Sequence, residues 1–368
     1  MNIECGQDKI IDGIHKAQRI AGRHPTLPVL SCLLLEAKKN NTLVIKATNL
    51  DLGVEIVIPA KVLKEGTVAV PAAVAYSFLS SLTTGGKDIK LEVDGNNLLI
   101  KTQHSNGTIK TMSHEEFPNI PRVVAGKEFN ISSNDFIKGL KNVWYSASIS
   151  GVKPELSSVY VYQDDGYIIF AATDSFRLAE KKIKLKKAVD FGQILVPFKN
   201  ISEIVRIFEG INAEMSISFN KNQISLSYNG VYLVSRVIDG VFPDYRQIIP
   251  KEVKTNSVIL KQDFADAMKI SHIFSDKFNQ IHFKIVPNKG VFEIQTKNND
   301  IGENLQKIDA TVSGDETEIN FNHRYIVDCL QSIDTDSISL DFSGPNKPLV
   351  IRPVADNSFL YLVMPMNR

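Results

Sequence analysis

The chain carries seven histidines and several adjacent acidic residues, the side chains most often used to bind metals and to transfer protons. No two histidines have the HxxxH spacing that places both on one helix face, and none lies near a cysteine at zinc-ligand spacing. His114-Glu115-Glu116 precedes a proline in a charged loop, and Asp164-Asp165 is typical of a turn. We therefore predict no catalytic residue, no metal site and no cofactor.

Nucleotide-binding and nucleophile motifs are also missing from the sequence. There is no GxGxxG and no GxSxG, and Gly85-Gly86-Lys87 lacks the first glycine and the Ser or Thr of a P-loop. Because a catalytic triad is defined in space and not by spacing, an enzyme with a site between domains stays open as an alternative.

Length and charge limit the remaining classes. The 368 residues are enough for two to four domains, at roughly 100–200 residues each. Lys and Arg number 42 against 41 Asp and Glu, so the net charge of +1 gives no sign of a strongly basic nucleic-acid binder. No apolar run approaches the roughly 18 residues of a membrane helix.

The three cysteines, Cys5, Cys32 and Cys329, form no CxxC pair and are odd in number. The first six residues lack the basic start and apolar stretch of a signal peptide. We therefore expect a cytoplasmic protein with reduced thiols, no disulfide and no membrane association.

Short motifs recur along the chain with one period. Phe117-Pro118-Asn119 returns 125 positions later as Phe242-Pro243-Asp244, and Ala47-Thr48-Asn49 returns after the same interval as Ala172-Thr173-Asp174. Val70-Pro71 returns as Val196-Pro197, and Phe321-Asn322 stands where a third copy of this pair should lie. Repeats of this length are large enough for each to form its own hydrophobic core. The sequence predicts three domains, at residues 1–124, 125–252 and 253–368.

Each copy has the same pattern of helices and strands. An amphipathic helix opens it, with one apolar face that in the second copy contains Phe136, Leu140, Val143 and Trp144. A second helix follows the Val-Pro or Phe-Asn pair, and the remainder reads as short strands separated by Asn, Asp and Gly turns. This indicates an α+β fold in which each domain is an antiparallel sheet with two helices.

The predicted helices carry scattered Lys and Arg on their polar faces. For any single helix, an ordinary solvated face is the preferred interpretation. In a repeat protein, however, equivalent faces can lie side by side, and a weak basic bias can then add up to a surface that contacts phosphates without reading sequence.

Longer motifs resemble a known family. The segments 172–179 (ATDSFRLA), 239–246 (DGVFPDYR), 363–366 (VMPM) and 24–30 (HPTLPVL) are similar to those of the bacterial sliding clamp, the β subunit of the replicative DNA polymerase. The similarity extends over the whole chain. It implies three structurally similar DNA-clamp domains, each an antiparallel sheet plus two helices, in a head-to-tail homodimeric ring.

The resemblance also implies a function. A clamp of this family encircles double-stranded DNA without sequence preference and is a non-catalytic processivity factor. It tethers the replicative DNA polymerase, and it binds the clamp loader and repair proteins through short linear motifs.

Those motifs enter a hydrophobic peptide-binding pocket in the family. The positions that match it here are Leu156, Thr173, Ser175, Phe176, Arg177, Leu178, Pro243, Gln247, Ile248, Pro348, Leu362, Met364, Pro365 and Met366. Leu and Met side chains would form an adaptable apolar surface, and Thr173 and Arg177 would anchor a peptide backbone. Ser175-Phe176 stands where the family often has Gly-His, and Gln247 where a common version has Arg.

The resemblance suggests two further sets of residues. Arg23, His24, Lys153 and Lys199 are candidate DNA contacts. Ile109, Ile273 and Phe274 match apolar positions of the dimer interface, although each could equally be a core residue. A repeat scaffold that binds peptides but not DNA remains the second alternative.

Overall fold

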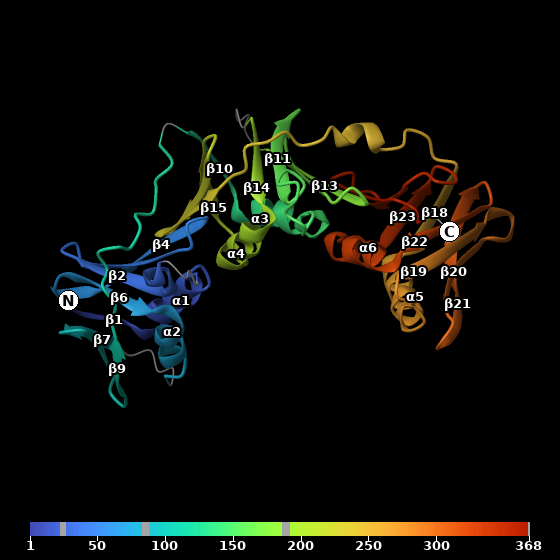
Figure 1. Ribbon diagram of the computed structural model, residues 1–368. Helices are drawn as coiled ribbons and strands as arrows, with labels where there is room; N and C mark the ends of the chain where they lie inside the picture. Colours follow the sequence, from blue (N-terminus) through green and yellow to red (C-terminus); the bar gives the residue numbers. More distant parts are fainter. Residues whose placement is uncertain (23–26, 83–87, 125, 186–191, 367–368) are drawn as a thin grey trace. The chain divides into compact units, whose positions relative to one another are not determined.

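The structure is a computed structural model that describes residues 1–22, 27–82, 88–124, 126–185 and 192–366. Its elements follow one order three times: a strand, a helix, three strands, a further strand, a second helix and three strands (Figure 1). The first repeat has one additional short strand, β5. The fold is α+β with antiparallel sheets, as predicted.

The elements of the first repeat are β1 (Asn2–Gly6), α1 (Gln7–Gln18), η1 (Pro28–Ser31), β2 (Cys32–Lys38), β3 (Thr42–Thr48), β4 (Leu52–Pro59), β5 (Lys61–Lys64), β6 (Gly66–Pro71), α2 (Ala72–Ser80), β7 (Asp88–Asp94), β8 (Asn97–Lys101) and β9 (Asn106–Lys110). Those of the second are β10 (Lys127–Ser132), α3 (Ser133–Lys141), η2 (Trp144–Ser146), β11 (Ser158–Asp164), β12 (Tyr167–Thr173), β13 (Arg177–Lys184), β14 (Gln193–Pro197), α4 (Phe198–Phe208), β15 (Glu214–Phe219), β16 (Gln223–Tyr228), β17 (Val231–Arg236) and η3 (Tyr245–Ile248). Those of the third are β18 (Thr255–Leu260), α5 (Lys261–Ile273), β19 (Gln280–Val286), η4 (Pro287–Lys289), β20 (Val291–Asn298), β21 (Gly302–Gly314), β22 (Thr317–Asn322), α6 (His323–Asp328), η5 (Cys329–Ser332), β23 (Ser337–Phe342), β24 (Leu349–Pro353) and β25 (Phe359–Val363).

The six predicted helices are confirmed, but three are shorter than their expected apolar faces, which reached Ala21, Trp144 and Leu330. The helices α1 and α6 end at Gln18 and Asp328. The helix α3 ends at Lys141, and Trp144 begins a separate 3-10 turn, although Val143 is still fully buried. In the third copy the residue before the second helix is Asn322 and not a proline. Its side chain caps α6 by accepting hydrogen bonds from the backbone N–H groups of Arg324 and Tyr325.

Glycine lets the first helix of two repeats approach its sheet closely. A Cβ on Gly13 of α1 would lie 2.7 Å from Ile45 Cδ1, and a Cβ on Gly139 of α3 would lie 2.3 Å from the ring of Phe170. The two pairs hold equivalent positions, since Ile45 and Phe170 are separated by the same 125 residues as the repeated motifs. These glycines therefore set the helix-to-sheet distance.

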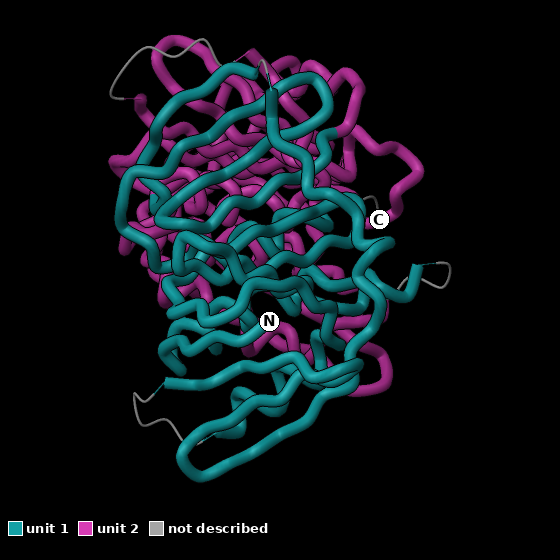
Figure 2. Tube along the Cα trace, turned by 90° about the vertical axis from the view of Figure 1, so that its left-hand side faces the viewer, with its two compact units in different colours: residues 1–134, 199–237 teal, residues 135–198, 238–368 magenta. Residues whose placement is uncertain are grey.

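The chain divides into two compact units (Figure 2). Unit 1 contains residues 1–134 and 199–237, with a five-stranded sheet and an eight-stranded sheet of order β10-β15-β16-β17-β4-β3-β2-β6. Unit 2 contains residues 135–198 and 238–368, with a twelve-stranded sheet of order β14-β11-β12-β13-β25-β24-β23-β18-β21-β20-β19-β22. The second repeat thus contributes one sheet segment to each unit.

Neighbouring repeats join through one antiparallel strand pair each. At the first junction β4 pairs with β17, with Leu52 opposite Ser235. At the second junction β13 pairs with β25, with Arg177 opposite Val363. The strands β4 and β13 hold the same place in their repeats, and so do β17 and β25. One rule therefore joins the repeats twice.

Two expectations from composition are tested by the fold. Cys5, Cys32 and Cys329 are all buried free thiols, as expected, and burial raises the pKa of Cys5 to about 12. No helix within the described ranges is long and apolar enough to cross a membrane. The ranges 1–124, 125–252 and 253–368 stay a prediction for the domain limits.

Candidate functional site

A compact apolar cluster lies at the second junction and gathers several of the predicted pocket residues. Leu178 of β13 pairs with Leu362 of β25, and both are almost fully buried. Their cluster also contains Ala171, Leu195, Phe242, Tyr245 and Val350, and half-buried Met364 packs against it. Three residues expected in the pocket, Leu178, Leu362 and Met364, are therefore in one place, although Leu178 is far from the other two in sequence.

The turn before β13 holds the polar members of the predicted set. The Thr173 hydroxyl donates to the carbonyl of Arg177 at 2.6 Å and accepts from the N–H of Ser175 at 3.1 Å. Asp174 Oδ1 accepts from the N–H groups of Phe176 and Arg177, both at 3.0 Å. Ser175 has a φ of 78°, in the left-handed region. The turn thereby presents Phe176 to solvent, 61% exposed.

Arg177 is bound within the chain on three sides. Its Nε donates to Asp174 at 2.9 Å, its Nη1 donates to Asp328 of α6, and its guanidinium lies 4.5 Å from the ring centroid of Tyr325. Thr173 is likewise engaged by its own turn. Both residues therefore fix the shape of the site, and peptide anchoring by them stays a prediction.

The C-terminal segment continues β25 along the same edge. The N–H of Met364 donates to the carbonyl of Phe176, and the N–H of Met366 donates to the carbonyl of Asn320, both at 2.8 Å. Met364, Pro365 and Met366 are each half-buried. The segment is tied down by backbone hydrogen bonds at the site, with its methionine side chains only partly covered.

The remaining predicted pocket residues lie on the segments around the cluster. Pro243, Gln247 and Ile248 are exposed on the linker that follows the second repeat, and Gln247 Nε2 donates to Asp244 at 2.8 Å. Leu156 and Pro348 are buried, just before β11 and β24 respectively. Exposed apolar side chains thus border a buried apolar cluster.

Several residues that shape the site were not predicted from the sequence. Asp174, Asp328 and Tyr325 hold Arg177, and Asp328 is 151 positions away in sequence. The repeated Thr-Asn and Thr-Asp pairs could have revealed Asp174, because Asn49 makes the same side-chain hydrogen bonds in the first repeat. Nothing in the sequence pairs Arg177 with Asp328.

Two more residues of the site were not predicted: Glu180 lies beneath the linker, and Tyr245 belongs to the linker. Each is only 4% exposed, and the Tyr245 hydroxyl donates to Glu180 Oε2. Burial raises the pKa of Tyr245, and the Glu180 carboxylate raises it further.

The candidate DNA contacts are only partly within the structure. Arg23 and His24 lie outside the described residues. Lys153 is exposed in the loop before β11, and Lys199 is exposed at the start of α4. Lys153 belongs to unit 2 and Lys199 to unit 1.

A basic hollow of about 380 Å³ lies between α1 and the end of α4 in unit 1. His15, Lys16 and Arg19 of α1 line it together with Arg206 of α4. Ion pairs of 2.7 Å join Lys16 to Asp12 and Arg206 to Glu203, so carboxylates moderate the positive charge. Helices from successive repeats therefore line one hollow, but α1 and α4 are not equivalent elements of their repeats. A basic surface built from equivalent helix faces stays a prediction.

The three predicted dimer residues have different environments. Ile109 of β9 is 5% exposed and belongs to the core of its unit. Ile273 is 63% exposed at the end of α5, and half-buried Phe274 follows it. A Cβ on Gly302 of β21 would lie 3.8 Å from the Phe274 ring, so Phe274 sits beside β21.

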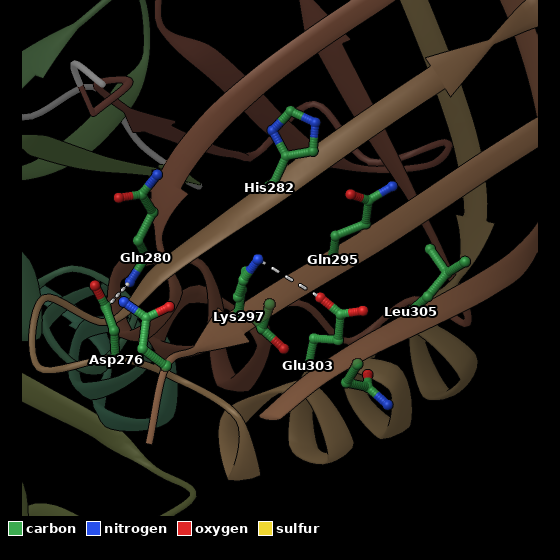
Figure 3. A pocket seen from close by; sticks show the side chains of 10 residues that line it. Asp276, Gln280, His282, Gln295, Lys297, Glu303 and Leu305 are labelled. Atoms are coloured by element: carbon green, nitrogen blue, oxygen red, sulfur yellow. Dashed lines mark hydrogen bonds and ion pairs between the residues drawn. The ribbon is translucent and has the colours of Figure 1, made fainter. Parts of the chain in front are cut away.

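A polar hollow of about 510 Å³ lies at the ends of β19, β20 and β21 (Figure 3). Asp276, Gln280, His282, Lys297 and Glu303 are among its lining residues, and Lys297 forms an ion pair with Glu303 at 3.9 Å. Among the described residues no group of three His, Cys, Asp or Glu side chains could hold a metal. The hollow borders β21, the strand beside which Phe274 lies.

Comparisons with known proteins agree along the whole chain. Models of the N-terminal, central and C-terminal domains of the DNA polymerase III beta subunit match residues 1–121, 130–244 and 246–367. The beta sliding clamp of Staphylococcus aureus is 26% identical over 381 residues, covering 100% of this chain and 99% of the relative.

Solved structures give the same result for the fold. The DNA polymerase III beta subunit of Thermotoga maritima is 25% identical, with a TM-score of 0.93 over 100% of this chain and 99% of that one. A Pseudomonas aeruginosa clamp bound to griselimycin is 24% identical, with a TM-score of 0.93 over both complete chains. The chain therefore belongs to the DNA polymerase III beta subunit family, the non-catalytic sliding clamps that encircle DNA for the replicative polymerase.

Proposed function

We propose that two copies of the chain close head to tail into a ring around duplex DNA, through β9 of one copy and β21 of the other. The observation that supports this most directly is the rule by which the repeats join. In the pairs β4·β17 and β13·β25, the fourth main strand of one repeat pairs with the last strand of the next repeat. Applied once more, this rule pairs the third-repeat equivalent of β13 with the first-repeat equivalent of β25 in another copy. These two strands are β21 and β9.

The register of the two junctions transfers to this seam. At the first junction Leu52 lies opposite Ser235, and at the second Arg177 lies opposite Val363. The equivalent pair at the seam is Ile301 and the partner's Ile109. Ile301 is 62% exposed in the single chain, and the partner strand would cover this apolar side chain. Because the Ile109 side chain is buried in its own unit, Ile109 would contribute to this seam through its backbone, at the edge of β9.

A phenylalanine stands beside a glycine both on the edge strand β9 and on the first part of β21, which pairs with β20 but not with β18. A Cβ on Gly107 of β9 would lie 2.4 Å from the Phe78 ring, as Gly302 of β21 lies beside Phe274. In the transferred register the partner's Gly107 lies opposite Glu303, next to Gly302. The two rings and exposed Ile273 would then form an apolar centre for the interface, flanked by the polar hollow of Figure 3.

A ring of this kind needs only weak attraction to its DNA. A closed ring cannot leave duplex DNA sideways, so affinity does not determine how long it stays. The balanced charge of the α1–α4 surface supports contact with phosphates that is weak enough to allow sliding and carries no base specificity.

The second-junction cluster is proposed to bind the partner proteins. Half-buried Met364 packs against the cluster that contains Leu178 and Leu362, and Phe176 and Ile248 are exposed on the adjoining turn and linker. These side chains suit a short apolar segment with leucine or phenylalanine side chains. We expect the replicative polymerase, the clamp loader and repair proteins to supply such segments. We also expect the compound named with the Pseudomonas aeruginosa structure, griselimycin, to bind this chain there.

The ring is tested with DNA of two topologies. After loading by a clamp loader, the chain should remain on a nicked circle through gel filtration and be lost when the circle is cut to a linear form. Equal retention on both forms would contradict encirclement and favour ordinary binding.

The peptide site is tested by calorimetric titration with griselimycin. Met364→Ala should weaken binding at least fivefold, and a fluorescein-labelled linear peptide with two leucines and one phenylalanine should compete with griselimycin. The control is Met112→Ala, an exposed methionine of the first repeat, which should bind as the wild type does. Unchanged affinity in Met364→Ala would remove this residue from the site.

A further inference from the structure

A buried carboxylate lies under the linker at the second junction. Glu180 of β13 is 4% exposed, and such a group is costly to bury unless hydrogen bonds satisfy it. The hydroxyl of Tyr245 donates to Glu180 Oε2, and Lys182 Nζ lies 3.3 Å from Oε1. Tyr245 is equally buried, at 4% exposed. The pair therefore fixes the linker to the sheet at one point.

This hydrogen bond is the last of three that run in one direction. Because the Tyr245 proton is directed to Glu180, the Tyr162 hydroxyl 2.8 Å away must donate to Tyr245. Arg246 Nη2 donates in turn to the Tyr162 hydroxyl at 2.9 Å and to Asp164. Successive donors polarise one another, so the chain orients the Tyr245 hydroxyl toward Glu180.

The same tyrosine ring belongs to the apolar cluster of the proposed peptide site. Tyr245 packs in one cluster with Leu178, Leu362 and half-buried Met364. Its neighbours in the linker, Pro243 and Ile248, are exposed on either side of it. The position of one buried ring therefore determines where the exposed linker side chains stand relative to the cluster.

At the first junction a carboxylate of the sheet also holds the linker, through other residues. Glu55 lies 125 positions before Glu180 and is 12% exposed in its side chain, and Arg122 of the preceding linker forms an ion pair with it. The Arg122 guanidinium also lies 3.8 Å from the ring centroid of Tyr232, whose hydroxyl donates to the carbonyl of Pro121. Both linkers are thus held by a carboxylate at the same position in the repeat, buried at the second junction and slightly exposed at the first.

The two junctions differ at the position of Leu178. The first has Gly53 there, and a Cβ on Gly53 would lie 3.1 Å from Ile120 Cγ2. Ile120, the equivalent of Tyr245, is 8% exposed and fills the space above the glycine. The first junction is therefore covered by its own linker, whereas the second has a leucine in the cluster and a tyrosine held by its hydroxyl.

We propose that Tyr245 and Glu180 are positioning residues that hold the segment from Pro243 to Ile248 as one side of the peptide site, and so set its affinity for apolar peptides. The proposal rests on the proposed function of the second-junction cluster. Neither residue needs to touch the peptide. The hydrogen bond between them acts by fixing side chains that do.

The test measures griselimycin binding by calorimetric titration on the full chain. Tyr245→Phe keeps the ring but removes the donor to Glu180, and we expect at least fivefold weaker binding. Glu180→Gln keeps an acceptor for the Tyr245 hydroxyl, and we expect affinity within twofold of the wild type. Rescue by this conservative change separates positioning from a general loss of stability.

Arg122→Ala is the matched control, because it removes the partner of the equivalent carboxylate at the first junction. It should leave griselimycin affinity unchanged, with thermal unfolding followed for every variant. Wild-type affinity in folded Tyr245→Phe would overturn the proposal while leaving the peptide site in place. If Tyr245→Phe does not fold, Glu180→Met decides, because it removes the acceptor of the same hydrogen bond, and wild-type affinity there overturns the proposal. Failure of the wild type itself to bind would overturn the proposed function, and this inference with it.

Discussion

Leu50 and Ser175 hold nearly the same left-handed backbone conformation, with φ of 76° and 78°, in equivalent turns of the first and second repeats. In both turns a threonine hydroxyl donates across to the first residue of the next strand, Thr48 to Leu52 and Thr173 to Arg177. The turn geometry is therefore a property of the repeat, although neither position is a glycine. A side chain with a Cβ is strained in this region.

Ser175→Gly should stabilise the protein. The left-handed conformation costs a residue with a Cβ about 1–2 kcal/mol, and the greater freedom of glycine when unfolded returns part of this. We expect the free energy of unfolding in urea to rise by about 0.5–1 kcal/mol. The control Ser80→Gly, in the exposed last turn of α2, should lower it. A decrease in Ser175→Gly would mean that the Ser175 side chain stabilises the turn.

Gly139→Ala should destabilise the protein, although alanine normally favours a helix over glycine by about 1 kcal/mol. The new Cβ would lie 2.3 Å from the fully buried ring of Phe170, so the helix or the ring would have to shift. Overpacking of this kind costs about 1–3 kcal/mol in urea unfolding. Gly6→Ala is the control, since its Cβ would come no closer than 3.9 Å to Lys9 and its effect should stay within about 0.5 kcal/mol. A stabilised Gly139→Ala would contradict the close approach of α3.

The sequence was most informative where a pattern repeats. The period of 125 residues predicted the order of helices and strands, and the spacing of apolar residues located α4 through Ile201, Ile204 and Phe208, all of them buried. Local composition also predicted the turn at Asp164-Asp165, which connects β11 to β12.

The sequence was least informative where the environment depends on distant residues. The sequence showed that Ser175 stands where the family often has glycine, but it did not show that Ser175 has a positive φ. The contact between Arg177 and Asp328 joins residues that no spacing relates, and the Tyr245–Glu180 hydrogen bond depends on where the linker crosses the sheet. Resemblance alone also could not reveal that Ile109 faces its own core.

His323 should make stability depend on pH. Its Nε2 lies 2.8 Å from the carbonyl of Met268, its buried Nδ1 has no hydrogen-bond partner, and its ring stacks on His272 at 4.8 Å. Burial lowers the pKa of His323, and the backbone carbonyl of Met268 offsets this only in part. The unfolded state therefore binds more protons just below its ordinary pKa of about 6.5, so stability falls as the pH drops through that window.

The measurement is urea unfolding between pH 7.5 and 5. His323→Gln should flatten the pH dependence, because the variant no longer has a buried imidazole to protonate. His104→Gln, at an exposed position, should keep the wild-type slope. Equal slopes in all three proteins would show that His323 does not contribute to the pH dependence.

Ile301→Asp should weaken the dimer. Ile301 is 62% exposed at the start of β21, and the transferred register places it opposite the partner's Ile109. A carboxylate buried there would lack a partner, and such a group at an interface costs about 2–5 kcal/mol. We expect sedimentation equilibrium to give a dissociation constant at least tenfold higher. Ile149→Asp changes a more exposed isoleucine outside the seam, 78% exposed, and should leave the dimer intact. A dimer unaffected by Ile301→Asp would exclude the β9–β21 register, because the joining rule that gives this register leaves Ile301 no other neighbour.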